Sequence, residues 1–357
     1  MLSVVLCLPA AHAANATHHA KPRPKAHFYR DDPRMHAFAQ TWASDHHLEP
    51  QEVIAALGKA QRRDDVIRLM APPANVHEKN WGTYRQNFVT SYRINKALKF
   101  WRHHARALQA AQDLYGVDAH IIVGLLGVET IYGEQRGRVP TLDALSTLAF
   151  DFPPEHPRAR ERAAYFQGEL GALLSLSRAT KRPLRQWRGS YAGALGYPQF
   201  MPSSWQRWAV DFDDNGQIDL IDSPVDAIGS VAHYLQVHGW VRGLKARWPA
   251  QVDESSPLLG QLLAPDILPT LDVPALRAGG VGMPDRIGAQ NQPLALVKLL
   301  NGRQQAPTYV IGSPNFYAIT RYNQSSYYAL AVVELGEAVA ARRSTQSKSK
   351  GKLRQQR

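Results

Sequence analysis

Apolar residues recur with the periodicity of an α-helix over much of the first 240 positions of the chain. They return every three or four residues over 32–69 and again over 95–115, which predicts amphipathic helices in both segments. Residues 117–132 are almost all apolar, as expected of a helix that is buried on every side. Serine followed by proline at 223–224 predicts the start of a further helix that runs to position 238, because proline fits the first helical turn.

The pattern changes beyond position 240, where prolines, glycines and short apolar runs replace the helical periodicity. Runs at 295–300, 308–312 and 316–322 predict the strands of a small antiparallel sheet. A last helical stretch covers 327–339. We therefore expect a mainly α protein of the α+β class, in which one small domain contains the β-strands.

The end of the chain is strongly basic. Lysines and arginines number 42 against 30 aspartates and glutamates, a formal charge of +12, and the segment 341–357 contains no acid. A like-charged run of low hydrophobicity cannot offset its ordering entropy, so we expect this tail to be disordered. It could make loose contacts with an anionic surface, but not specific contacts with nucleic acid, because no aromatic residues are interleaved with its charges. These charges are Arg342, Arg343, Lys348, Lys350, Lys352, Arg354 and Arg357.

The start of the chain indicates export. Residues 1–14 form a short apolar stretch that ends in Ala-His-Ala, which predicts a secretory signal peptide followed by a linker over 15–27. Cys7 is the only cysteine, and Leu6 stands where a lipoprotein signal needs a small residue, so we expect no lipid anchor. No other stretch approaches the roughly 20 apolar residues of a membrane span. We predict a soluble, exported protein; for a bacterial chain this means the periplasm.

One carboxylate lies at the end of the apolar segment 121–133. Removal of Glu129 from water would raise its pKa, and a neutral glutamic acid can donate a proton near pH 7. The alternative is that Glu129 is a salt-bridged or partly exposed helix residue, with Arg136 or Arg138 as its partner. The residues alone leave both interpretations open.

Residues 189–202 interrupt the helical pattern and combine glycines, two tyrosines and an amide. Such a loop lets backbone approach a ligand and offers aromatic faces to a sugar ring, but it could equally be a tightly packed turn. Ser203, with Gln206 three residues later, predicts a capping box at the start of a short helix.

A second chemical motif follows the calcium-loop pattern. Oxygen-bearing side chains occupy the first, third, fifth and seventh positions, a glycine the sixth, and an aspartate the twelfth, where a bidentate glutamate is usual. We predict a Ca²⁺ site with a structural role. Its ligands would be Asp211, Asp213, Asn215, Gln217 and Asp222.

Several ordered motifs together resemble the lytic murein transglycosylase B family. They are Gly-Val-Glu-Thr at 127–130, the segments 143–150 and 192–204, Val-Asp-Ala-Ile-Gly-Ser at 225–230 with His-Gly-Trp at 238–240, and 316–323. The resemblance extends from Phe38 to Leu335. It implies a helical domain over 28–110, a lysozyme-like catalytic core over 111–243 with an EF-hand-like loop at 211–226, a small antiparallel β domain over 244–315, and a segment at 316–340 that returns to the core.

The resemblance also implies roles for individual residues. Glu129 corresponds to the catalytic acid, and Asp226 to the last calcium ligand, so either Asp222 or Asp226 could close the metal site. Asp226 also fits the acidic first turn of the predicted helix. Pro198 stands where the family usually has glycine. The residues that would contact the saccharide are Ser190, Tyr191, Tyr197, Gln199, Tyr322 and Asn323.

The implied substrate is the glycan strand of peptidoglycan. Glu129 would act first as acid and then as base at the bond between N-acetylmuramic acid and N-acetylglucosamine, leaving a 1,6-anhydro end. Glu134 lies about 140° further around the helix and is poorly placed as a second carboxylate, whereas Asp143 and Asp151 stay open. A non-catalytic scaffold and a hydrolytic muramidase are the alternatives. We expect a monomer without an organic cofactor.

Overall fold

The computed structural model describes residues 27–72, 78–285, 287 and 291–355. The predicted signal peptide, residues 15–26 of the linker and Cys7 lie outside this part. The described chain forms two compact units. Unit 1 comprises 27–72, 137–195 and 199–207, and unit 2 comprises 78–136, 196–198 and the described residues of 208–355. These units cross the predicted domain boundaries, and both contain part of the predicted core 111–243.

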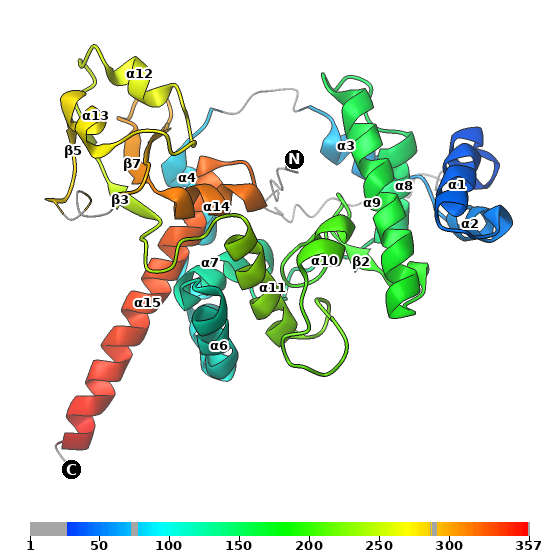
Figure 1. Ribbon diagram of the computed structural model, residues 1–357, viewed down its shortest axis with the longest axis horizontal. Helices are drawn as coiled ribbons and strands as arrows, with labels where there is room; N and C mark the ends of the chain where they lie inside the picture. Colours follow the sequence, from blue (N-terminus) through cyan, green and yellow to red (C-terminus); the bar gives the residue numbers. More distant parts are fainter. Residues whose placement is uncertain (1–26, 73–77, 286, 288–290, 356–357) are drawn as a thin grey trace, which may run out of the picture. The chain divides into compact units, whose positions relative to one another are not determined.

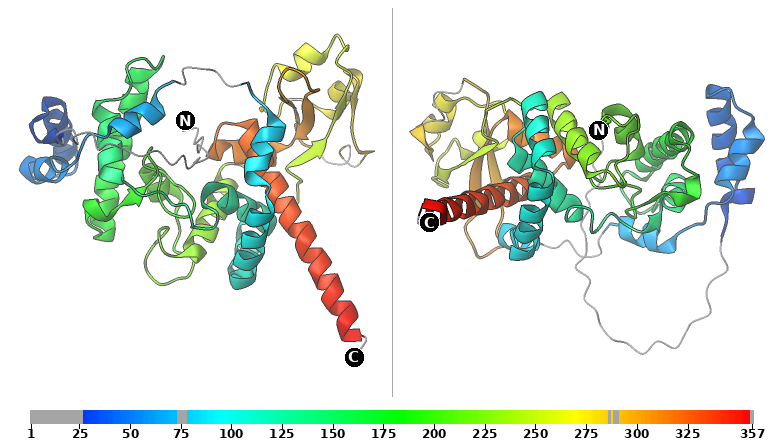
Figure 2. Two further views of the ribbon diagram at one scale, coloured as in Figure 1. Left: turned by 180° about the vertical axis from the view of Figure 1, so that it is seen from behind. Right: turned by 90° about the horizontal axis from the view of Figure 1, so that it is seen from below.

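Unit 1 is helical, as the periodicity over 32–69 predicts. Asp32 caps its first helix by accepting a hydrogen bond from the Arg34 amide, 2.8 Å away. Helices α8 and α9 pack along each other (Figures 1 and 2). The helices are α1 (Pro33–Asp45), α2 (Pro50–Leu57), α3 (Asp64–Met70), α8 (Thr141–Phe150), α9 (Ala159–Thr180) and α10 (Pro202–Trp208, which ends in unit 2), with short antiparallel strands β1 (Val139–Pro140) and β2 (Arg188–Gly189).

The predicted capping box at Ser203 is wrong. Helix α10 begins one residue earlier, at Pro202. The Ser203 amide and hydroxyl both donate to the buried carboxylate of Glu169 in α9, at 2.9 and 2.6 Å. A partner from another helix therefore takes the hydrogen bonds that a local box would make.

Unit 2 is built around helix α7. All of its residues are buried or half-buried, as the apolar segment predicts. Gly124 lets α15 approach closely, because a Cβ there would lie 2.2 Å from the Val332 carbonyl oxygen. The segment 95–115 is two helices rather than one, broken at His104. The helices are α4 (Trp81–Phe88), α5 (Ser91–His103), α6 (Ala105–Tyr115), α7 (Ala119–Thr130), α11 (Pro224–Val237), α14 (Pro314–Tyr322) and α15 (Ser326–Gln355).

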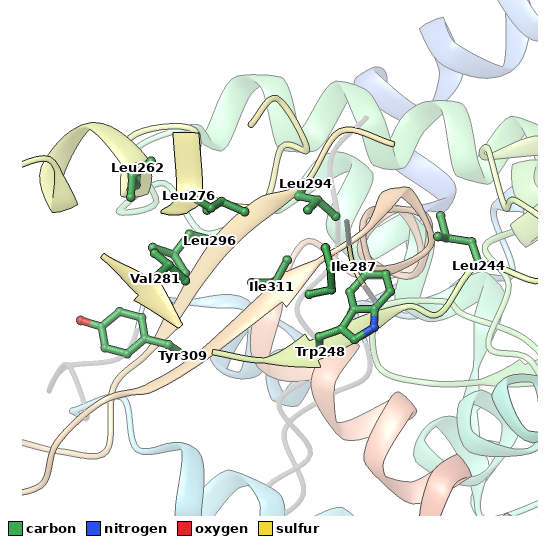
Figure 3. Close-up of a cluster of buried hydrophobic side chains, with 10 residues drawn as sticks. All are labelled: Leu244, Trp248, Leu262, Leu276, Val281, Ile287, Leu294, Leu296, Tyr309 and Ile311. Carbon is green, nitrogen blue, oxygen red and sulfur yellow. The ribbon is translucent and has the colours of Figure 1, made fainter. Parts of the chain in front are cut away.

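A small β region completes unit 2. Strands β3 (Arg247–Pro249), β7 (Thr308–Gly312) and β6 (Ala295–Leu299) form an antiparallel sheet in that order, and β4 (Gln251–Val252) pairs with β5 (Val281–Gly282). Helices α12 (Leu259–Leu263) and α13 (Val273–Ala278) lie nearby, and side chains from these elements enclose an apolar core that includes Trp248, Leu276, Leu296 and Ile311 (Figure 3).

The predicted strand over 316–322 is wrong, because this segment belongs to helix α14. Ser313 caps that helix by accepting a hydrogen bond from the Asn315 amide at 3.0 Å, and Pro314 occupies its first turn. Phe316 and Ile319 are buried at helical spacing. The third strand of the sheet is instead β3, whose three residues carry too short a pattern to predict.

The basic tail also differs from its prediction. Helix α15 continues to Gln355 and includes most of the segment expected to be disordered (Figure 1). Alanine, arginine, lysine and glutamine favour helices, and extending an existing helix avoids the cost of nucleation. Arg343 also lies over the Trp101 ring, 3.9 Å from its centroid. Within the described residues, no helix combines the length and apolar character needed to cross a membrane.

Candidate active site and metal loop

Glu129 lies in the last turn of α7 and is half-buried. Its Oε1 accepts a hydrogen bond from the Tyr328 hydroxyl in α15, at 2.5 Å. Burial raises the pKa of Glu129 from 4.5 to about 7, and the Tyr328 hydrogen bond opposes this shift by favouring the charged form. A carboxylic acid with this pKa can both donate and accept a proton near neutral pH.

The structure does not contain the alternative ion pair of Glu129. Arg136 donates instead to the Ile221 carbonyl oxygen and pairs with Asp222 at 3.3 Å. Over the described residues, no ion pair joins Glu129 to Arg138 or to any other cation. An ionised Glu129 is therefore stabilised by one hydrogen bond from a neutral hydroxyl and not by a cation.

A left-handed turn ends α7 directly after this carboxylate. Ile131, Tyr132 and Gly133 have φ values of 52°, 57° and 91°. Gly133 is required there, because a Cβ would lie 2.3 Å from the Tyr197 ring. Thr130 fixes the same turn by donating to the Tyr197 carbonyl oxygen at 2.9 Å and accepting from the Gly133 amide at 3.0 Å.

Two tyrosines of unit 2 lie near Glu129, and a third packs against one of them. The rings of Tyr322 and Tyr328 are parallel, with centroids 6.5 Å apart, and Tyr234 meets Tyr322 edge to face at 4.8 Å. Tyr322 donates to the Pro198 carbonyl oxygen at 2.5 Å. Burial, followed by the nearby Glu129 charge, raises the pKa of Tyr322 and of Tyr328 well above 10, so both hydroxyls stay neutral donors.

The other residues predicted to contact the saccharide divide between the two units. Tyr197 and Asn323 lie in unit 2 with Glu129, and the buried Asn323 Oδ1 has no hydrogen-bond partner within the described chain. Ser190, Tyr191 and Gln199 lie in unit 1.

The unit 1 residues sit in a tight loop. The Ser190 Oγ accepts from the amides of Ala192 and Ala194 at 3.3 and 3.1 Å. Tyr191 is half-buried, and Gln199 has a left-handed φ of 52°. These contacts fit the packed-turn interpretation of the sequence, and contact of the loop with a ligand stays a prediction.

Other carboxylates have partners of their own. Glu134 is exposed and binds Tyr92 and Lys96. In unit 1, Asp143 accepts from the Gln61 amide at 3.0 Å, and Asp151 is held by the hydroxyl of Tyr29 and by the guanidinium groups of Arg34 and Arg62. Nothing in these contacts assigns a proton-transfer role to them.

Tyr328 is the site residue that sequence reasoning missed. Its signal was weak but present, because a tyrosine within the apolar run 327–335 must find a partner for its hydroxyl. The sequence could not identify Glu129 as that partner, since the two residues are 199 positions apart.

The metal loop brings three carboxylates together. One oxygen each from Asp211, Asp213 and Asp226 lies within 4.8 Å of the others. Asp222 instead points toward Arg136, and its side chain is 62% exposed. The converging oxygens have no cationic side chain among the described residues, and hard oxygen ligands suit Ca²⁺, so this donor set fits the ion.

Backbone amides shape the same loop. Asp226 is fully buried and accepts from the amides of Phe212 and Asp219 at 2.9 and 2.8 Å. Burial raises its pKa. The Asn215 Oδ1 accepts from the Gln217 amide at 2.9 Å, so these two predicted ligands take part in the turn itself.

The end of the metal loop contacts the segment that carries Tyr197. The Tyr197 amide donates to the Leu220 carbonyl oxygen at 2.9 Å. Gly196 permits this approach, because a Cβ there would lie 2.1 Å from the same oxygen. Arg136 lies over the Tyr197 ring at 5.2 Å while it binds Ile221. Tyr197 therefore contacts both the metal loop and the turn after Glu129.

Comparisons with known proteins identify the family of the chain. The transglycosylase SLT domain model matches residues 30–337. Membrane-bound lytic murein transglycosylase B of Escherichia coli is 39% identical over 324 residues, which cover 88% of this chain and 85% of the relative.

Solved structures show the same likeness. Escherichia coli lytic transglycosylase Slt35 is 39% identical, with 88% of this chain and 95% of that chain covered; its TM-score is 0.78 for the complex with bulgecin A and 0.77 for the complex with calcium. Soluble lytic transglycosylase SltB1 of Pseudomonas aeruginosa is 36% identical, with a TM-score of 0.78 and coverage of 87% and 100%. These matches confirm the predicted fold class, mainly helical with a lysozyme-like core. The chain belongs to the transglycosylase SLT domain family and, within it, to the lytic murein transglycosylase B proteins.

Proposed function

We propose that this peptidoglycan lytic transglycosylase uses Glu129 as its single acid and base. The observation that carries the proposal is a carboxyl group with a pKa raised to about 7 by burial, hydrogen-bonded to one buried tyrosine. The substrate bond is the β-1,4 link from N-acetylmuramic acid to N-acetylglucosamine.

The reaction needs two proton transfers through the same carboxyl group. Neutral Glu129 donates its proton to the leaving glycosidic oxygen, and the acetamido group of the substrate stabilises the positive charge that develops at the anomeric carbon. The ionised Glu129 then accepts the proton of the muramoyl O6 hydroxyl as O6 bonds to that carbon. The product carries a 1,6-anhydro ring, and Glu129 is neutral again.

A single carboxyl group is enough for this chemistry. Glycosidases that use water need a second carboxylate as nucleophile or base. Here the attacking hydroxyl belongs to the substrate, and the carboxylates nearest in sequence have other partners. Glu134, for example, is bound by Lys96 and Tyr92.

We propose that the glycan strand contacts the residues that the family resemblance implies. An unpartnered buried acceptor at Asn323 suits the amide and hydroxyl donors of amino sugars. These residues are Ser190, Tyr191, Tyr197, Gln199, Tyr322 and Asn323.

We further propose that Asp211, Asp213 and Asp226 bind a structural Ca²⁺, with Asn215 and Gln217 completing the loop. The ion would neutralise the converging carboxylates, which otherwise repel one another. No step of the glycan reaction depends on it.

We also infer where the enzyme works. Export by the signal peptide would place it in the periplasm. We expect a monomer, and a basic C-terminus whose contact with anionic surfaces is weak and sensitive to salt.

Replacement of Glu129 tests the proposed chemistry. Glu129→Gln cannot donate or accept the proton, so the release of 1,6-anhydro muropeptides from purified peptidoglycan should fall by roughly 10²–10⁴-fold. Mass spectrometry of the products measures this. Glu134→Gln, a matched change on the surface, should keep its activity. Equal product from Glu129→Gln and wild type would refute the assignment, and products heavier by one water would indicate hydrolysis.

The raised pKa of Glu129 also predicts how stability depends on pH. Since the folded pKa of about 7 lies above the unfolded value, the neutral acid stabilises the fold at low pH, and this contribution is lost as pH rises through 7. The free energy of unfolding of Glu129→Gln, measured relative to wild type, should therefore be higher at pH 8 than at pH 4 by about 1–3 kcal/mol. Urea unfolding at both pH values measures this gain. A constant difference would contradict the burial of the charge.

Calcium should stabilise the fold through the three converging aspartates. At 100 times the dissociation constant, Ca²⁺ should raise Tm by about 5 °C relative to EDTA. Asp213→Asn should abolish most of this rise, whereas Asp222→Asn should retain it, because Asp222 pairs with Arg136. Differential scanning calorimetry provides the test. Identical unfolding in Ca²⁺ and EDTA would exclude the site.

A further inference from the structure

Helix α5 contributes a buried arginine that the proposed chemistry does not use. Arg93 is 8% exposed, and within the described chain no carboxylate pairs with it. Burial lowers its pKa. A cation held out of water without a counter-charge is costly unless its hydrogen bonds compensate. Its contacts should therefore reveal what it does.

Arg93 donates to backbone rather than to an acid. Its Nη1 donates to the Gly127 carbonyl oxygen at 2.5 Å, and its Nε to the Asn87 carbonyl oxygen at 3.2 Å. Its guanidinium group also lies over the Phe88 ring, 5.2 Å from the centroid. Arg93 therefore joins α7 to the end of α4.

The Gly127 carbonyl needs this donor because of the way α7 ends. In a regular α-helix, the amide of Ile131 would bond to Gly127, four residues earlier. The left-handed turn redirects the amides of both Ile131 and Tyr132 to the Leu126 carbonyl oxygen. Without Arg93, a buried carbonyl two residues before Glu129 would lack a partner.

Side chains also pack closely against the Cα of Gly127 in the same turn. A Cβ at Gly127 would lie 2.3 Å from the Tyr132 hydroxyl and 2.8 Å from Leu335 of α15. Helix α15 also carries Tyr328, the hydrogen-bond donor to Glu129. The last turn of α7 is therefore held by two contacts: Arg93 binds its Gly127 carbonyl, and Leu335 of α15 packs against Gly127.

We propose that Arg93 is a positioning residue for Glu129: by binding the Gly127 carbonyl, it fixes the last turn of α7 and keeps the carboxyl group aligned with Tyr328. This inference rests on the proposed function, because the alignment matters only if Glu129 transfers protons. Arg93 itself does not touch the substrate.

Arg93→Met tests the proposal, since methionine keeps an unbranched apolar stem and loses the donors. With a soluble glycan oligomer, at a temperature where circular dichroism shows a folded protein, kcat should fall roughly 10–100-fold. KM should stay within about two-fold, because ground-state binding of substrate is unchanged. Arg93→Lys keeps one donor and should recover part of the loss.

Arg242→Met is the matched control. Arg242 donates to the Gln112 and Asp113 carbonyl oxygens at 3.2 and 2.7 Å, so it also caps a helix end, that of α6, which carries no proposed site residue. It should lower Tm and leave kcat unchanged. Wild-type kcat in Arg93→Met, or an equal loss in Arg242→Met, would overturn the positioning role. Full activity of Glu129→Gln would instead refute the proposed function itself.

Discussion

The proposed active site depends on one carboxyl group that lies half-buried at the end of an apolar helix. Helix α7 can bury Glu129 only because other helices enclose it, and the closest of them, α15, also supplies the Tyr328 hydroxyl. Gly124 makes that approach possible. Burial of this group therefore destabilises the fold when the carboxyl group is charged, and it raises the pKa of Glu129 to about 7. The fold limits that cost with one neutral hydrogen bond, and it avoids a cation that would return the pKa to its ordinary value.

Much of this arrangement could be predicted from the sequence because it is local. The apolar run around Glu129, the spacing of acids in the metal loop and the Ser-Pro start of α11 are each contained within a few turns of chain. The choice of Glu129 as catalyst needed the family resemblance as well, since residues alone left an ion pair open. The structure contains no such pair in its described part.

The features that escaped prediction are set by distant contacts. Tyr328 reaches Glu129 across 199 positions, and Ser203 bonds to Glu169 rather than to its own helix. The short strand β3 is stabilised by pairing with β7, which its own three residues cannot indicate. The metal loop and Glu129 are far apart in the sequence. In the structure, Tyr197 contacts both the Leu220 carbonyl and the turn after Glu129.

The most direct test of the account is the titration of Glu129 itself. Carbon-13 NMR of labelled glutamate side chains, assigned by comparison with Glu129→Gln, reports the midpoint of its ionisation. The account predicts a midpoint near 7, shifted upward in Tyr328→Phe because the hydrogen bond that favours the charged form is lost. A midpoint near 4.5, unchanged in Tyr328→Phe, would show an ordinary hydrated carboxylate and contradict the central claim.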